Sequence, residues 1–248
     1  MSRSNNTELI NPAKRFYEWN GDKGGFRYFD KQLGEKGERV EVPLPFRFLI
    51  LDCLSTIKGY DDADKSGYWC NEVRDLKKDI MSVKNKKGTQ AIGLYEQVIT
   101  NRNCTGAKYC QSVYIAFKEG QELIICNIQM LGACLGAWIE FRKKNKIYEG
   151  AIAVEKMIEG TKGKTVYQIP VFKSIPTTPE TEDQAKHLDI ELQEYLKTYF
   201  QRNSTQSAEK SEAVAEVYDE QFHDDAPIGE APQDTVIVDN YDPENAPY

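Results

Sequence analysis

The chain has 248 residues, of which 40% are hydrophobic and 29% are charged, and its formal net charge is −7. This length suits one large domain or two small ones, and an acidic net charge taken alone argues against nucleic-acid binding. The longest apolar stretch, 123–139, is interrupted by Asn127 and Gln129, which excludes it as a transmembrane helix.

The charge is unevenly distributed along the sequence. Residues 206–248 hold twelve acids and one base, whereas residues 1–173 carry a net charge of +7. A basic body joined to an acidic end is typical of proteins that bind nucleic acid and carry a charged tail. The polar, acidic composition of residues 204–248 predicts a disordered tail.

Cysteine and histidine usage argues against a metal site. The six cysteines form no CxxC pair, and the sequence holds two histidines, so we expect no structural zinc and no other metal or cofactor. Residues 1–12 are polar and lack the apolar core of a signal peptide. We therefore expect reduced thiols and a cytoplasmic location.

The first 173 residues predict mainly strands. Aromatic runs on both sides of the Gly-rich turn 20–25 indicate a β-hairpin over residues 14–31. Further strands are expected at 46–57, 67–73, 80–84, 108–117, 122–130, 152–158 and 165–172.

Two segments show helical spacing. Apolar residues fall on one helical face at 131–144, with bases at the C-terminal end, and a second helix is expected from about residue 181 to about residue 200. A helix followed by two strands suits an OB-like barrel, which carries a helix between its third and fourth strands. Because more than five strands are predicted, such a barrel needs extensions or must be larger.

The predicted fold class is therefore mainly β (α+β), namely an OB-like barrel with an inserted helix, a C-terminal helix and a disordered acidic tail. The expected divisions are a flexible N-terminus (1–10), the OB-like nucleic-acid-binding domain (11–173), a linker with the C-terminal helix (174–203) and the acidic tail (204–248).

Binding a single strand requires cations along the phosphates and rings under the bases. The hairpin mixes both kinds of side chain, and a lysine-rich stretch follows Trp69. The alternative is that the rings pack in the core and the lysines form an ordinary solvated surface. The candidate nucleic-acid-binding residues are Arg15, Tyr17, Trp19, Arg27, Tyr28, Lys31, Trp69, Arg74, Lys77, Lys84 and Tyr109.

The C-terminus predicts a partner-binding peptide. Its acids and final ring suit a basic-rimmed apolar pocket, or it competes with DNA for the basic groove. The alternative is an inert solubilising tail. The candidate partner-binding residues are Asp239, Asp242, Glu244, Pro247 and Tyr248.

Sequence motifs of catalysis are missing. The chain contains no phosphate loop, no GxGxxG turn, no GxSxG and no HExxH, so we expect a protein that is not an enzyme. A nuclease built from converging carboxylates stays open as a weaker alternative.

Three blocks of sequence resemble a known family. Asn11–Lys31, Val42–Ile57 and Asn71–Arg74 are similar to single-stranded DNA-binding proteins of tailed bacteriophages with Bacteroidetes-type hosts. The resemblance covers about residues 11–173. It implies single-stranded DNA binding in the host cytoplasm, and it transfers no individual site residue.

The tail has a separate resemblance. Ala246-Pro247-Tyr248 after Glu244-Asn245 is similar to the acidic tips of bacterial single-stranded DNA-binding proteins, with tyrosine in place of phenylalanine. The resemblance implies recruitment of replication or repair enzymes, and the substitution leaves open whether they come from host or phage.

We therefore expect sequence-independent binding of single-stranded DNA in replication, recombination or repair, with partner recruitment by the tail and no membrane association. The competing interpretation is a non-catalytic protein–protein adaptor or a virion-associated β protein. Homo-oligomerisation and the choice between DNA and RNA are left open.

Overall fold

The computed structural model of the chain describes residues 9–63 and 65–221, with side chains as far as Asn203. The chain divides into two compact units, the first ending at Ser204 and the second beginning at Thr205. The tail residues predicted to bind partners lie outside the described residues.

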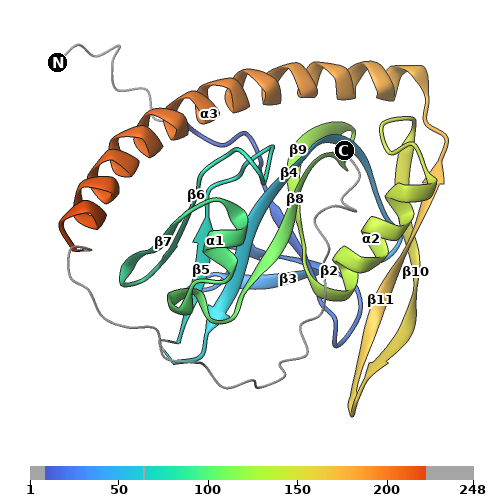
Figure 1. Cartoon of the computed structure of the whole chain (residues 1–248). Coiled ribbons are helices and arrows are strands. Elements are labelled where there is room, and N and C mark those ends of the chain that lie inside the picture. The colour runs from blue at the N-terminus through green and yellow to red at the C-terminus, as the bar shows by residue number, and fades with distance from the viewer. Residues whose placement is uncertain (1–8, 64, 222–248) are drawn as a thin grey trace. The chain divides into compact units, whose positions relative to one another are not determined.

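The described residues form a mainly β structure with one eleven-stranded sheet and three α-helices (Figure 1). In chain order the elements are β1 (Phe16–Trp19), β2 (Phe26–Asp30), β3 (Glu38–Val42), β4 (Phe46–Asp61), β5 (Ser66–Cys70), β6 (Met81–Asn85), β7 (Gly88–Gly93), α1 (Tyr95–Ile99), the 3-10 helix η2 (Arg102–Cys104), β8 (Ala107–Glu119), β9 (Glu122–Met130), α2 (Gly132–Lys144), β10 (Ala151–Lys162), β11 (Thr165–Ile175) and α3 (Pro179–Gln221).

The long strand β4 organises the sheet. One of its edges pairs with β8 from Phe48 to Gly59, and the other edge pairs first with β10 and then with β5. Its sequence is a nearly continuous run of apolar and β-branched residues, and both of its faces are buried over most of its length. Strands covered on both faces have this composition.

Five strands and one helix follow the order of an OB-like barrel. They are β4, β8, β9, β10 and β11, and α2 lies between the third and the fourth. The predicted mainly β class, its inserted helix and its C-terminal helix are confirmed. The remaining strands are an N-terminal extension, β1–β2–β3, and an insertion, β5–β6–β7, between the first two barrel strands.

The N-terminal extension closes the curved sheet. β1 pairs in parallel with β9 and antiparallel with β2, which confirms the predicted hairpin. At its turn the carbonyl oxygen of Gly21 accepts a hydrogen bond of 2.7 Å from the amide of Gln168 on β11. The indole N–H of Trp19 donates to the Gln168 carbonyl at 2.8 Å. Thus the hairpin joins β9 to the far edge of the barrel.

Three apolar clusters fill the first unit. The first lies inside the barrel and contains Tyr17, Phe46 and Trp138. The second lies between the outer face of β4, β8 and β9 and the helix α3, which contributes Leu192 and Leu196. The third supports the β5–β7 insertion.

Several element boundaries differ from the sequence prediction. β3, β7 and α1 were not predicted, because each has only five or six residues and too few apolar positions to show a period. α3 continues to Gln221, well past the predicted end near Phe200 and into the segment predicted as a tail from Ser204. Its first turns are held by apolar packing, whereas the continuation has the alanine and glutamate content that favours helix.

Trp19→Ala tests the closure of the barrel. The indole packs edge-on against Phe26 at 5.1 Å between ring centroids and also makes the bond to Gln168. We expect a loss of about 2–3 kcal/mol in the free energy of unfolding, measured by urea denaturation. Phe29→Ala is the control, since that ring is 55% exposed and its removal should cost less than about 1 kcal/mol. Equal effects of the two substitutions would contradict a closing role.

Candidate nucleic-acid interface

A row of side chains crosses four adjacent strands at one end of the sheet. Lys108 on β8 is paired with Lys58 on β4, Lys58 with Trp69 on β5, and Trp69 with Lys84 on β6. Directly opposed residues of antiparallel strands project from the same face. We call these four residues the lysine–tryptophan row; at about 4.8 Å per strand it spans roughly 14 Å.

The row lies on the open face of the insertion. Trp69 is 47% exposed, and Tyr60, two residues beyond Lys58 on the same face of β4, is 53% exposed. The neighbouring residues Ile57 and Tyr68 point to the opposite face and are buried in the third apolar cluster. The alternation therefore places a core on one side and two accessible rings on the other.

The lysines of the row form no direct ion pair. Lys58, Lys84 and Lys108 have no carboxylate within ion-pair distance among the residues that the structure describes. Lys58 is still near enough to the buried Glu72 to lower the pKa of that carboxyl, so Lys84 and Lys108 are the more available to an anion. Two exposed rings beside three unpaired ammonium groups provide stacking surfaces and phosphate contacts in one place.

The hairpin rings have a different role from the one predicted. Tyr17 is 1% exposed inside the barrel, so it cannot stack on a base. Trp19 and Tyr28 pack against the same core. The outward-facing rings of the hairpin are Phe16 and Phe29, which are 42% and 55% exposed.

The hairpin cations are also engaged locally. Arg15 pairs with Glu119, and its guanidinium lies 4.9 Å from the centre of the Tyr28 ring. Arg27 pairs with Glu18 at 2.8 Å. These two arginines hold strands together and are withdrawn from the candidate site.

Four other residues that the sequence suggested for DNA binding lie elsewhere in the structure. Arg74 is ion-paired, and Tyr109 packs against the third cluster while its hydroxyl contacts Ser55 at 3.1 Å. Lys31 and Lys77 are exposed on the loops after β2 and after β5. None of these four belongs to the row.

The structure thus brings together Trp69 and Lys84 of the predicted residues. It adds Lys58, Tyr60 and Lys108, which the sequence reasoning missed. Lys58 and Tyr60 alternate with apolar residues at the end of β4, a pattern typical of a half-exposed strand. That alternation could have identified Lys58 and Tyr60 as exposed residues from the sequence.

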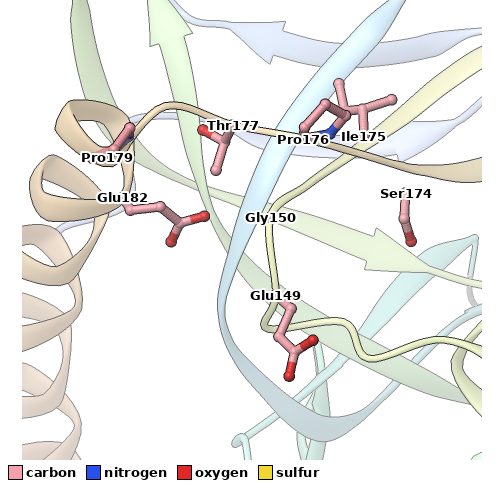
Figure 2. Close-up of a pocket in the computed structure, with 8 residues that line it drawn as sticks. All are labelled: Glu149, Gly150, Ser174, Ile175, Pro176, Thr177, Pro179 and Glu182. Carbon is pink, nitrogen blue, oxygen red and sulfur yellow. The ribbon is translucent and has the colours of Figure 1, made fainter.

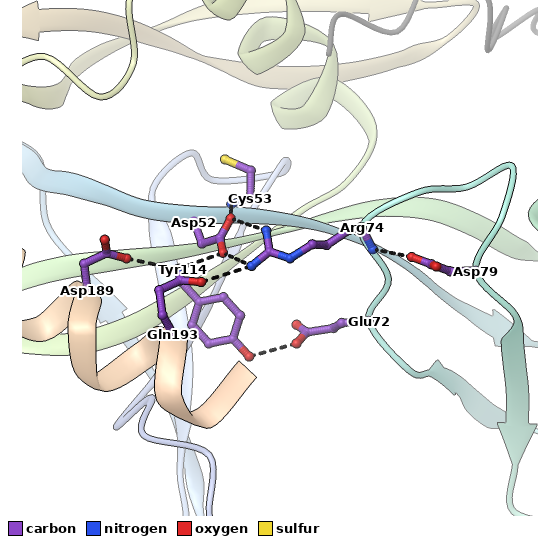
Figure 3. A network of polar contacts seen from close by, with 8 residues as sticks. All are labelled: Asp52, Cys53, Glu72, Arg74, Asp79, Tyr114, Asp189 and Gln193. Carbon is purple, nitrogen blue, oxygen red and sulfur yellow. Dashed lines mark hydrogen bonds and ion pairs between the residues drawn. The ribbon is translucent and has the colours of Figure 1, made fainter. Parts of the chain in front are cut away.

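Next to the row, α3 lies on the outer face of the barrel, and a network of polar contacts connects the helix to β4 and to the loop between β5 and β6 (Figure 3). Arg74 donates to both carboxylate oxygens of Asp52 through its two terminal guanidinium nitrogens, at 2.7 and 3.2 Å. Gln193 of α3 donates to Asp52 at 3.1 Å and to Asp189 at 3.0 Å. The loop between β5 and β6 is thereby tied both to β4 and to α3.

A carboxylate lies at the centre of the same interface. Glu72 accepts hydrogen bonds from the hydroxyls of Ser112 and Tyr114, the latter at 2.8 Å. Its amide donates to the hydroxyl of Tyr199 on α3 at 2.8 Å. Burial raises the pKa of Glu72 above its ordinary value, although the two hydroxyl donors and nearby Lys58 act in the opposite direction.

Two surface pockets lie away from the row. A cavity of about 510 Å³ below the β11–α3 connection is lined by Ile175 and Pro176 and by the carboxylates of Glu149 and Glu182 (Figure 2). A second, of about 380 Å³, lies between the β1–β2 turn and β3. The acidic lining of the first pocket does not suit a polyanion.

Within the described residues, no three His, Cys, Asp or Glu side chains are grouped so that they could hold a metal ion. The helices of this part of the chain include none that is long and apolar enough to cross a membrane.

Comparison with known proteins finds no match to this chain, whether among protein-family models, curated proteins or solved structures.

Glu72→Gln tests the raised pKa. The folded state favours the protonated carboxyl, so the contribution of Glu72 to stability is full below about pH 4 and is lost as the pH rises through its raised pKa. We expect the free energy of unfolding of the wild type, relative to the variant, to fall as the pH rises above about pH 4. Urea denaturation at several pH values measures this difference. A difference that stayed constant or rose with pH would show that the carboxylate is not destabilised by burial.

Proposed function

We propose that the chain is a non-catalytic, sequence-independent single-stranded DNA-binding protein acting in replication, recombination or repair. The lysine–tryptophan row with Tyr60 carries this proposal. Its three lysines are complementary in charge to a phosphate backbone, and the exposed rings of Trp69 and Tyr60 can stack on unpaired bases.

The location of the row agrees with the architecture. OB-fold barrels bind oligonucleotides on the face of their second and third strands and on the loop between the first and second. Here α3 covers much of the outer face of β8, and the β5–β7 insertion stands in place of that loop. The part of this surface that stays open is the end carrying Lys108, Lys58 and Trp69.

The chemistry of the row explains a lack of sequence preference. Stacking of a base on an aromatic ring contributes about 1–3 kcal/mol and tolerates every base, because each base has a π face. Lysine contacts phosphate as a point charge and reads no base edge. A duplex keeps its bases stacked on each other, so the rings favour single strands.

The charge distribution extends this proposal to the tail. The body that carries the row is basic, whereas residues 222–248 contain seven acids and no base. Such a segment recruits partners through its terminal acids and ring, and it also competes with DNA for the lysines.

The first test compares variants of the row by fluorescence anisotropy with labelled oligo-dT over a salt series. Trp69→Ala should weaken binding about 5- to 150-fold, as expected for one stacked base. Replacing Lys58, Lys84 and Lys108 with Gln should also reduce the log–log salt slope by about 2, because each phosphate contact contributes about 0.7.

The matched control replaces Lys118, Lys144 and Lys197 with Gln, which changes the net charge equally at exposed positions outside the row. We expect it to keep most of the affinity. If both triple variants lose the same affinity, net charge and not the row is responsible. If the folded wild type binds no oligo-dT, the proposal fails.

Deleting residues 222–248 tests the tail. Removing seven negative charges should tighten oligo-dT binding, with the larger gain at low salt, where electrostatic competition is least screened. The same anisotropy assay measures the change. Unchanged affinity at low salt would show that the tail does not compete with DNA for the binding surface.

A second candidate function is a protein–protein adaptor. The observation that favours it is the hairpin, whose rings Tyr17 and Phe26 are fully buried. Its outward ring Phe29 lies beside two acids and two bases, which are Glu18, Arg27, Arg39 and Glu41. A charge-balanced apolar surface suits a protein better than a polyanion. Failure of oligo-dT binding by the folded wild type would make this function the first choice.

A further inference from the structure

β3 forms one end of the sheet. It pairs with β2 along Glu38–Val42, and no other described strand pairs with its second edge. An unpaired edge presents a row of free backbone N–H and C=O groups to any strand of matching sequence. Pro43 follows directly, so the available edge is limited to these five residues.

The side chains of β3 alternate between two faces. Val40 is opposite Tyr28, and Val42 is opposite Phe26, so both valines lie on the barrel side. Arg39 and Glu41 lie on the outer face, and both are exposed. Their local contacts are loose: Arg39 is 3.6 Å from Glu18, and Glu41 accepts a bond of 3.3 Å from Asn20.

We propose that β3 pairs antiparallel with β3 of a second copy of this chain, about a two-fold axis at Val40. Val40 is both the middle residue of the strand and the centre of its charge pattern. Arg39 of each copy then faces Glu41 of the other, so one symmetric contact contains two opposite-charge pairs. All five residues of the strand find a partner.

Other registers are disfavoured by the same side chains. An axis at Arg39 or at Glu41 places two like charges directly opposite each other. Parallel in-register pairing opposes arginine to arginine and glutamate to glutamate. A one-residue shift turns the valines of one copy to the solvent face. The charges that protect this edge against random pairing therefore select one arrangement.

The contact is small. Pairing of five residues buries less than the roughly 1,000 Å² of a stable interface, so we expect a reversible dimer with a dissociation constant of roughly 10–100 µM. The pairing uses β3 alone and does not depend on DNA binding. In the absence of DNA the full chain should therefore self-associate.

Charge-swap variants test the pairing by sedimentation equilibrium. Arg39→Glu and Glu41→Arg should each weaken self-association at least tenfold, because like charges then face each other twice. The double variant should restore it. An equimolar mixture of the two single variants should form a heterodimer, since one copy then carries two acids and the other two bases at the facing positions.

Lys197→Glu on α3 is the matched control for a charge reversal and should leave the association unchanged. Thermal unfolding by circular dichroism establishes that each variant is folded. Either a wild type that stays monomeric at several times the expected dissociation constant, or two folded single variants that do not associate when mixed, would overturn the proposal. Heterodimer formation in the mixture would support it, because no change in folding explains that result.

Discussion

The structure depends on one strand that serves two parts of the sheet. β4 pairs with β8 along one edge, while its other edge pairs with β10 in the barrel and then with β5 in the insertion. The β4–β8 register shifts between Ile50 and Asp52. A bulge of this kind changes which residues face the core. Beyond it Ile57 faces the core, and Lys58 faces solvent beside Trp69.

A second constraint is the helix that covers the barrel. Leu192 and Leu196 bury apolar residues of β4, β8 and β9, which closes the surface that such barrels commonly offer to oligonucleotides. The Asp52–Arg74–Gln193 contacts tie the same helix to the loop between β5 and β6. The strands on either side of that loop carry Trp69 and Lys84, so the helix also supports the proposed binding surface.

Much of the fold and part of the candidate site could be predicted from the sequence. The apolar and β-branched runs 108–117 and 122–130 on either side of the Glu119-Gly120 turn, and the helical spacing in 131–144, reflect burial, and these elements were predicted correctly. Trp69 and Lys84 were named because an aromatic residue preceded a lysine-rich stretch. Short polar strands were missed, since tertiary pairing and not composition makes them strands.

The sequence by itself determined the mainly β class, the inserted helix and the separation of a basic body from an acidic end. These depend on local periodicity and on composition. Only the tertiary structure decided which cations and rings are accessible. Arg15 and Arg27 are paired across strands, and Tyr17 fills the barrel, whereas Lys58 and Lys108 come to lie beside Trp69. Such pairings join residues distant in sequence, and strand register, which no local pattern encodes, determines them.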